Sequence, residues 1–460
     1  MSDAINVGIR ALELYFPKNF VDQTEFEKFN GETNPGKYTI GFGQLKMGFY
    51  CDHEDINSIC LTVTNNLLEK NEIDKNSIGF LAVGTETIID KSKSVKTVLM
   101  RLFGENTDIE GVDVKNACYG GTQALFHAVD WVRANWESEK RYAIAVMADI
   151  AIYANGPARP TGGAGAFAVL IGPDAPFVVE KGLRATFMED VYDFYKPIGG
   201  VASDFPVVNG PLSLSAYSKA LKNTYKKYQE KAKRIIKEDV SLDSFDSVMF
   251  HSPFVRSVQK NLGLLAYSDY LNGKTNKLVD PQNFSQFTKM SDQDLHGNAN
   301  FTKVSLASSI NLWQEKTAPN TCFNQLIGNM YTPSLYGQLV SRIGRIEGPL
   351  QHNLRFLLFS YGSGCASTMF SMISNTCADK EILEKMKASC QDAVKRLDQR
   401  TKVSPEVYTQ KLDERDILNQ GILPYVPKSV NNEQLTNLFP GTFYLTDVDA
   451  KFRRSYAFHS

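Results

Sequence analysis

One cysteine lies where an apolar, strand-like run passes through a turn into a helix. Cys118 follows the run 111–114 and lies two residues before a glycine pair, Gly120 and Gly121. Amides at a helix N-terminus stabilise negative charge, so we expect this position to favour the nucleophilic thiolate. The glycines would let a substrate approach the backbone closely. The segment therefore predicts a cysteine that accepts an acyl group, although a buried structural cysteine would give the same local pattern.

A glutamate and a histidine follow two other apolar runs. Glu86 comes just after 78–84, and His251 comes directly after 245–250. A carboxylate at the end of an apolar core can have a raised pKa and act as a general acid or base. Taken alone, a loop glutamate and a structural histidine are the commoner interpretations. With Cys118 they suit acyl transfer to the thiol, removal of an acetyl methyl proton, and polarisation of an acceptor carbonyl.

Three further segments could bind a ligand. The glycine-rich turn 362–365 follows another apolar run, and its amides could bind an oxyanion or simply form a tight turn. Residues 51–54, Cys-Asp-His-Glu, have metal-ligand side chains but no partner pair at ligand spacing, so we interpret them as a polar helix start and predict no metal site. The glycine-rich run 161–166 precedes a strand instead of following one, which argues against a dinucleotide loop.

The elements that must position these residues alternate between strands and helices. Apolar runs at 142–148 and 166–171 are typical of central strands, and the alternation predicts an α/β fold with a mainly parallel sheet. A change of pattern after 172 predicts two halves, 1–172 and 173–460. Within the second half we expect a polar surface insertion or mobile loop near 272–300 and a peripheral, charged helical region near 380–420.

Composition limits the classes of function. The 460-residue chain has 50 basic and 51 acidic residues, which argues against nucleic acid or an anionic membrane as a partner. It has no apolar stretch of about 20 residues, and residues 1–7 lack the features of a secretory signal, so we expect a cytoplasmic protein. Its seven cysteines include no C-x-x-C pair, so we expect all of them, Cys377 included, to be reduced.

Several long segments are specific enough to indicate a protein family. They include Asn116-Ala117-Cys118-Tyr119-Gly120-Gly121-Thr122, and also 84–97, 158–163, 192–197, 250–253, 328–332 and 438–445. From about Asn6 to Tyr456 the chain resembles the eukaryotic hydroxymethylglutaryl-CoA synthases. The resemblance implies a thiolase-like α/β fold, in which two similar halves form a five-layer αβαβα sandwich, and it implies a homodimer.

The resemblance also implies roles for individual residues. Cys118 looks like the acetyl-accepting nucleophile, Glu86 like the general acid/base, and His251 like the residue that binds and polarises acetoacetyl-CoA. Further positions are implied to contact the CoA substrates, with Arg256 standing where the family has a lysine: Thr161, Ser213, Arg256, Lys260, Asn329 and Ser363. The implied substrates are acetyl-CoA and acetoacetyl-CoA, the implied pathway is the mevalonate pathway, and neither a cofactor nor a metal is expected.

Two other interpretations are open from the residues. A thiolase would use a second cysteine as its base, for which Cys365 is the candidate, and a ketoacyl synthase would pair the cysteine with two histidines or with histidine and asparagine. The segment around Glu86 fits neither class. A CoA-binding scaffold without activity is the non-enzymatic alternative, and the presence of Cys118, Glu86 and His251 argues against it.

Overall fold

The computed structural model describes residues 6–197, 204–375, 378–419, 421–430 and 435–460. The expectations for residues 1–5, for Cys377 and for residue 420 lie outside the described residues. The described strands are β1 (Val7–Tyr15), β2 (Asn19–Asp22), β3 (Lys46–Phe49), β4 (Ile78–Gly84), β5 (Asp113–Val114), β6 (Tyr142–Ala151), β7 (Gly163–Pro173), β8 (Phe177–Val179), β9 (Ala185–Met188), β10 (Phe194–Tyr195), β11 (Val207–Val208), β12 (Ser247–Phe250), β13 (Arg355–Gly362), β14 (Ala366–Ser374), β15 (Thr401–Val403), β16 (Thr442–Val448) and β17 (Arg454–His459). The described α-helices are α1 (Gln23–Phe29), α2 (Ile56–Lys70), α3 (Val95–Leu99), α4 (Gly120–Glu139), α5 (Gly210–Ile235), α6 (Val255–Leu271), α7 (Asp292–Leu295), α8 (Ala299–Ser308), α9 (Ile310–Lys316), α10 (Cys322–Ile327), α11 (Ser334–Gly344), α12 (Lys380–Arg396) and α13 (Pro405–Asn419).

Ten of the described strands form one mixed sheet, in the order β12-β13-β14-β8-β1-β7-β6-β4-β5 with β9 also beside β14. Only β4–β5, β4–β6 and β12–β13 pair in parallel, and the other neighbours are antiparallel. The prediction of a mainly parallel sheet is therefore wrong. The central strands are buried on both faces as expected, but β7 follows β6, and β14 follows β13, through short connections that require antiparallel pairing.

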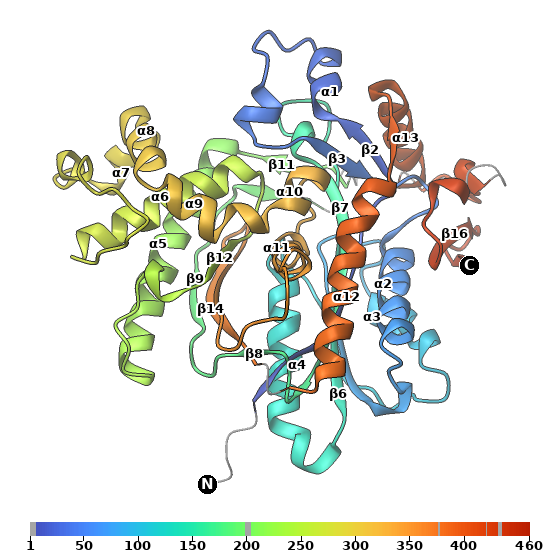
Figure 1. The fold of residues 1–460 in the computed structure, drawn as a ribbon. Coiled ribbons are helices and arrows are strands. Elements are labelled where there is room, and N and C mark those ends of the chain that lie inside the picture. The colour runs from blue at the N-terminus through green and yellow to red at the C-terminus, as the bar shows by residue number, and fades with distance from the viewer. Residues whose placement is uncertain (1–5, 198–203, 376–377, 420, 431–434) are drawn as a thin grey trace.

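The two halves of this sheet repeat one topology. The order β1-β7-β6-β4 and the order β8-β14-β13-β12 each contain two antiparallel pairs followed by one parallel pair. Helices α4 and α11 lie between the halves, α2 covers the outer face of the first half, and α5 covers the outer face of the second (Figure 1). The result is the layered α/β sandwich that the sequence predicts, and β4 and β12 occupy equivalent places in it.

Helix α12 is not peripheral, which corrects the expectation for 380–420. It packs against β1 and α11 and buries Met386 and Cys390 (Figure 1). At its end, Arg396 donates a hydrogen bond of 2.8 Å to the carboxylate of Glu13, which is fully buried in β1. The charged composition misled the prediction because one apolar stripe is enough to bury one face of a helix.

The polar stretch 272–300 is a packed surface addition and not a mobile loop. Phe284 and Phe287 occupy a short 3₁₀ turn, and Leu295 ends α7. These three side chains form a small apolar core with Tyr267 of α6 and Phe301 of α8. The overall polarity of the segment concealed these few buried aromatic residues.

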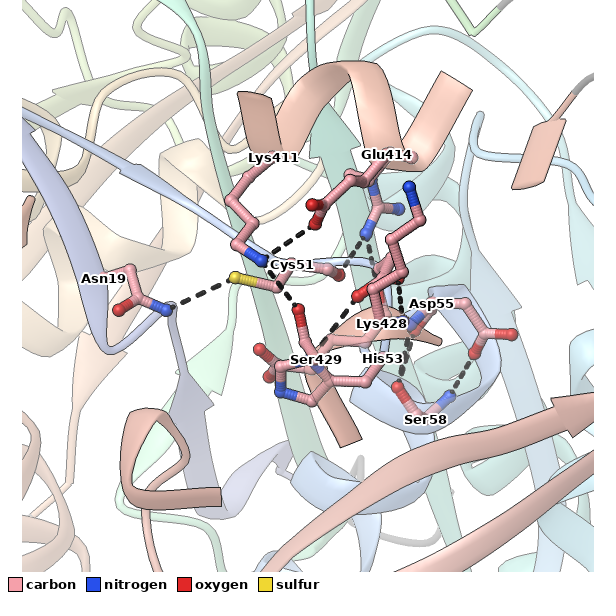
Figure 2. Close-up of polar contacts among 12 residues, drawn as sticks. Asn19, Cys51, His53, Asp55, Ser58, Lys411, Glu414, Lys428 and Ser429 are labelled. Atoms are coloured by element: carbon pink, nitrogen blue, oxygen red, sulfur yellow. Dashed lines mark hydrogen bonds and ion pairs between the residues drawn. The ribbon is translucent and has the colours of Figure 1, made fainter. Parts of the chain in front are cut away.

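Residues 51–55 precede α2, as the prediction of a helix start requires, but they are buried. Asp52 accepts hydrogen bonds from the Tyr425 hydroxyl (2.6 Å) and the Lys428 amide (2.7 Å). Arg415 of α13 donates to the carbonyls of Cys51 and Glu54, each at 2.7 Å, and Figure 2 shows Cys51 among the polar side chains of this region. The network attaches the C-terminal segment to the first half. The described residues contain no group of three His, Cys, Asp or Glu side chains that could hold a metal ion.

Among the described residues, no helix is both long and apolar enough to cross a membrane.

Candidate active site

Glu86 and Cys118 meet at the edge of the sheet where β4 and β5 end. The Cys118 amide donates a hydrogen bond of 2.7 Å to Oε2 of Glu86. Cys118 has a φ of 53°, a left-handed conformation that is unfavourable for a residue with a side chain. Close packing fixes the loop, since a Cβ on Gly84 would lie only 2.4 Å from Cα of Gly121. The structure thus brings together two of the three predicted catalytic residues.

Asp149 accepts a hydrogen bond from the backbone of Glu86, and the sequence analysis did not identify this residue. Its fully buried carboxylate accepts hydrogen bonds from the Glu86 amide and from the hydroxyls of Thr85, Thr87 and Thr332. Burial, and then the nearby charge of Glu86, raise the pKa of Asp149 to about 6. Asp149 directly follows the apolar run 142–148, so the strand-end rule that selected Glu86 could have found it.

Lys196 is the second residue that the sequence reasoning missed. Its Nζ lies 3.1 Å from Oε1 of Glu86, and only 16% of its side chain is exposed. Burial is the largest single effect and lowers the pKa of Lys196, but the charges of Glu86, Asp204 and Asp149 together raise it above its ordinary value. Lys196 falls within the segment 192–197, which is part of the family resemblance. That resemblance could have identified the residue.

The thiol of Cys118 is protonated in the resting site, so the expectation of a favoured thiolate is wrong. Burial, followed by the negative charges of Glu86 and Asp149, raises the pKa of Cys118 well above its ordinary value. Helix α4 begins only at Gly120, two residues further on. Its amides therefore do not offset burial and the charges of the two carboxylates.

His251 follows β12 and is 3% exposed. Its amide donates to the carbonyl of Phe359, and its carbonyl accepts from the hydroxyl of Tyr217, both at 2.7 Å. Burial lowers the pKa of His251 to about 3, so the imidazole is neutral at physiological pH. A neutral imidazole polarises a carbonyl by donating a hydrogen bond, without first carrying a full charge.

Strand β13 connects the surroundings of His251 to those of Cys118. It runs parallel to β12, so both strands end at the same edge of the sheet. Ser360 of β13 bonds to Thr122 of α4 at 2.7 Å. Gly362 packs so closely that an added Cβ would lie 1.7 Å from the carbonyl oxygen of Ala117. The three predicted catalytic residues therefore lie along the boundary between the two halves.

Three of the predicted substrate-contacting residues lie in loops that adjoin this boundary. The Asn329 amide donates to the carbonyl of Thr161 at 3.2 Å, which makes these two residues neighbours. The side chain of Asn329 is held by the Tyr331 amide (2.8 Å) and the Ser334 hydroxyl (2.9 Å). Ser363 lies in the turn between β13 and β14.

The other three predicted substrate-contacting residues lie on helices of the second half. Ser213 is in the first turn of α5, and Arg256 and Lys260 are four residues apart on α6, on one helix face. Lys260 is exposed, whereas Arg256 is half-buried and bonds to Gln259. Among the described residues, no hydrogen bond or ion pair joins these three to Cys118 or Glu86.

The comparisons with known proteins cover both halves. A family model described as hydroxymethylglutaryl-coenzyme A synthase N terminal matches residues 4–176, and the corresponding C-terminal model matches residues 177–459. A hydroxymethylglutaryl-CoA synthase of Caenorhabditis elegans is 46% identical over 99% of this chain and 94% of the relative. The cytoplasmic enzyme of Homo sapiens is 44% identical over 98% of this chain and 87% of the relative, and the mitochondrial enzyme of Mus musculus is 44% identical over 98% and 89%.

Solved structures agree with the layered fold. A structure titled MvaS in complex with 3-hydroxy-3-methylglutaryl coenzyme A superposes with a TM-score of 0.82 at 29% identity, covering 99% of this chain and all of the other. A further structure, titled HMG_CoA synthase complexed with CoA, has a TM-score of 0.73 at 23% identity and supports the fold alone. With both family models, near-complete relatives and this thiolase-like fold in agreement, the chain belongs to the hydroxymethylglutaryl-CoA synthase family.

Proposed function

We propose that this chain condenses acetyl-CoA with acetoacetyl-CoA and water to give 3-hydroxy-3-methylglutaryl-CoA and CoA through an acetyl-Cys118 intermediate. Family membership over nearly the whole chain supports the overall reaction, which belongs to the mevalonate pathway. The assignment of Cys118 and Glu86 as catalytic partners rests on the 2.7 Å hydrogen bond from the Cys118 amide to the Glu86 carboxylate. The CoA thioesters are substrates, and the reaction as proposed requires no cofactor.

The first step transfers the acetyl group to Cys118. The sulfur attacks the carbonyl of acetyl-CoA, the bond from that carbonyl to the CoA sulfur breaks, and CoA leaves with the proton lost by the thiol. Because the resting thiol has a raised pKa, this proton must depart as the new bond forms. Protonation of the resting thiol also limits unwanted reactions of a free thiolate.

The second step forms the carbon–carbon bond. Glu86 takes a proton from the methyl group of acetyl-Cys118, and the resulting carbanion attacks the ketone carbon of acetoacetyl-CoA. His251, which is neutral, donates a hydrogen bond to the ketone oxygen, and the proton that Glu86 removed passes to that oxygen, which forms the hydroxyl of the product and restores Glu86 as a base. Water then cleaves the bond between the product and the sulfur of Cys118, which frees the new carboxyl group and restores the thiol.

The remaining predicted residues are proposed to bind the substrates. Thr161 and Asn329 are neighbours, Ser363 lies in the turn between β13 and β14, and Ser213 lies in the first turn of α5. Arg256 and Lys260 would attract the phosphates of CoA, because the net charge of −1 leaves anion binding to local cations. We further propose a cytoplasmic homodimer. The relatives are named both cytoplasmic and mitochondrial, so cell fractionation is the test of location, and the mass in solution is the test of the dimer.

The experiment that tests these roles separates the two steps. Glu86→Ala should still acquire one acetyl group from acetyl-CoA, mapped to Cys118 by mass spectrometry, because methyl deprotonation follows acyl transfer. Product formation with acetoacetyl-CoA should fall by about 10²–10⁴-fold. The control is Glu105→Ala, which alters an exposed glutamate of the same half and should leave both steps unchanged.

Two results would contradict this scheme. If folded Glu86→Ala is not acetylated, Glu86 activates the thiol instead of the methyl group. If the acetyl group of the wild-type enzyme maps to Cys365, the thiolase-like alternative is correct.

A further inference from the structure

We propose that Lys196 is a positioning residue for Glu86, whose carboxylate it holds in place for removal of the methyl proton. This inference rests on the proposed role of Glu86. The two carboxylate oxygens have different partners: Oε2 accepts from the Cys118 amide at 2.7 Å, and Oε1 lies 3.1 Å from Nζ of Lys196. Glu86 is thus fixed from two sides, by the loop that carries the nucleophile and by a cation.

The surroundings of Glu86 explain why a cation is needed there. Glu86 is 8% exposed, and Asp149 beneath it is fully buried. A buried carboxylate needs a compensating partner for its negative charge, and a second carboxylate nearby increases that need. Lys196 is the only ion-pair partner that Glu86 has among the described residues. Its charge also lowers the pKa of Cys118 and of Asp149, against the larger effect of burial on both.

Aromatic rings hold the ammonium in place. Nζ of Lys196 lies 4.9 Å from the ring centre of Tyr331 and 5.8 Å from that of Phe194, within the range of a cation–π interaction. Tyr331 is fully buried and packs edge-on against Phe194 at 5.7 Å. The lysine therefore has little freedom to leave Glu86, which suits a fixed charge better than a mobile surface side chain.

The backbone before Lys196 is also anchored. Residue Asp193 accepts hydrogen bonds from the Gly364 amide (2.9 Å) and the Tyr361 hydroxyl (3.1 Å), which ties this segment to the end of β13. Lys196 therefore reaches across from the second half to a glutamate of the first half. The placement of this cation beside the base therefore depends on the correct packing of both halves.

The pH dependence of the condensation step tests this inference. Removing a cation within about 4–6 Å of a carboxylate raises the pKa of that carboxylate by about 1–3 units. In Lys196→Met, the acidic limb of the kcat–pH profile should therefore move to higher pH by about 1 unit or more. Condensation should be slow near neutral pH and recover as the pH is raised, while acetylation of Cys118 should continue.

Three further variants make the result specific. Lys196→Arg restores the charge and should return the acidic limb towards its wild-type position. Lys196→Gln also removes the charge, and it provides the same test if the Met variant does not fold. The control, Lys181→Met, alters an exposed lysine of the second half and should leave the profile unchanged.

An acidic limb that stays at its wild-type pH in folded Lys196→Met or Lys196→Gln would overturn the inference, and so would equal impairment of the Arg and Met variants at every pH. The role of Glu86 is judged separately. If Glu86→Ala abolishes condensation while Lys196→Met has a wild-type profile, only the inference about Lys196 fails. If Glu86→Ala condenses normally, the proposed role of Glu86 fails, and the role of Lys196 fails with it.

Discussion

The charge states in this site are set by neighbouring residues more than by the reacting groups themselves. Burial and two carboxylates raise the pKa of Cys118, burial keeps His251 neutral, and Glu86 has a lysine beside it. An acid–base cycle needs each group in a defined state before the substrate arrives. In this protein the buried ion pair and the buried imidazole supply those states.

His251 leads to a prediction about acid stability. Its pKa is about 3 in the folded protein but about 6.5 in an unfolded chain, so the unfolded state binds more protons between these values. Stability from this group is fully present above about pH 6.5 and is lost as the pH falls, at up to about 1.4 kcal/mol per pH unit. In urea unfolding at about pH 7 and about pH 5, His251→Gln should lose about 2 kcal/mol less on acidification than wild type.

The control for this measurement is His127→Gln, which alters an exposed histidine on α4. Its loss of stability on acidification should match that of wild type. An equal loss in His251→Gln and wild type would show that His251 takes up its proton in the folded protein.

Residue types at strand ends predicted Glu86, Cys118 and His251, but not the residues that set their charges. The rule that reactive side chains follow apolar runs needs only local sequence. Asp149 satisfies the same rule and was passed over, whereas Lys196 is positioned by short strands and by rings from distant segments. The charge state of Cys118 was predicted wrongly because it depends on two carboxylates that are distant in sequence.

At the scale of elements, the close contact between the end of β13 and the Cys118 loop fixes the position of that loop. Gly362 has no room for a side chain, since an added Cβ would lie 1.7 Å from the carbonyl oxygen of Ala117. Gly362→Ala should therefore displace the loop, slow the acetylation of Cys118, and destabilise the fold by about 1–3 kcal/mol. Intact-protein mass after mixing with acetyl-CoA, together with urea unfolding, measures both effects.

Gly210→Ala is the matched control for that variant. Gly210 begins α5, and a Cβ added there meets no atom within 4 Å. It should acetylate and unfold like wild type. If Gly362→Ala does the same, the end of β13 does not constrain the loop.

Element types were easier to predict than their pairing or placement. The apolar runs gave β6 and β7 correctly, but burial on both faces does not specify strand direction, and the sheet is mixed. The charged composition of α12 concealed a buried stripe, and the polar stretch before α8 concealed Phe284 and Phe287. In each case a few residues in contact with distant elements decided the outcome.

At the scale of the whole molecule, the C-terminal segment is attached to the start of α2 through buried polar groups. The Tyr425 hydroxyl donates to Asp52 at 2.6 Å, and Asp52 is fully buried (Figure 2 shows the neighbouring groups). Tyr425→Phe leaves that carboxylate with one donor fewer, so the free energy of unfolding should fall by about 1–3 kcal/mol. Hydrogen exchange should increase in residues 435–460, which would show that the segment depends on this attachment.

An exposed tyrosine provides the comparison. Tyr195→Phe alters a side chain that is 39% exposed and should change stability by less than about 0.5 kcal/mol. If the two variants unfold alike, the Asp52 network does not stabilise the attachment of the C-terminal segment.

The repeated topology has a consequence for the direction of the reaction. Glu86 follows β4 and His251 follows β12, so equivalent positions of the two halves carry unlike side chains. Both substrates are acyl thioesters of the same carrier and would be interchangeable in a truly symmetric site. In the proposed mechanism one position removes a proton and the other polarises a ketone, so a thioester in one place becomes the carbon nucleophile and a thioester in the other becomes the electrophile. On that proposal, the broken symmetry of the scaffold decides which of two similar molecules gives up its methyl proton.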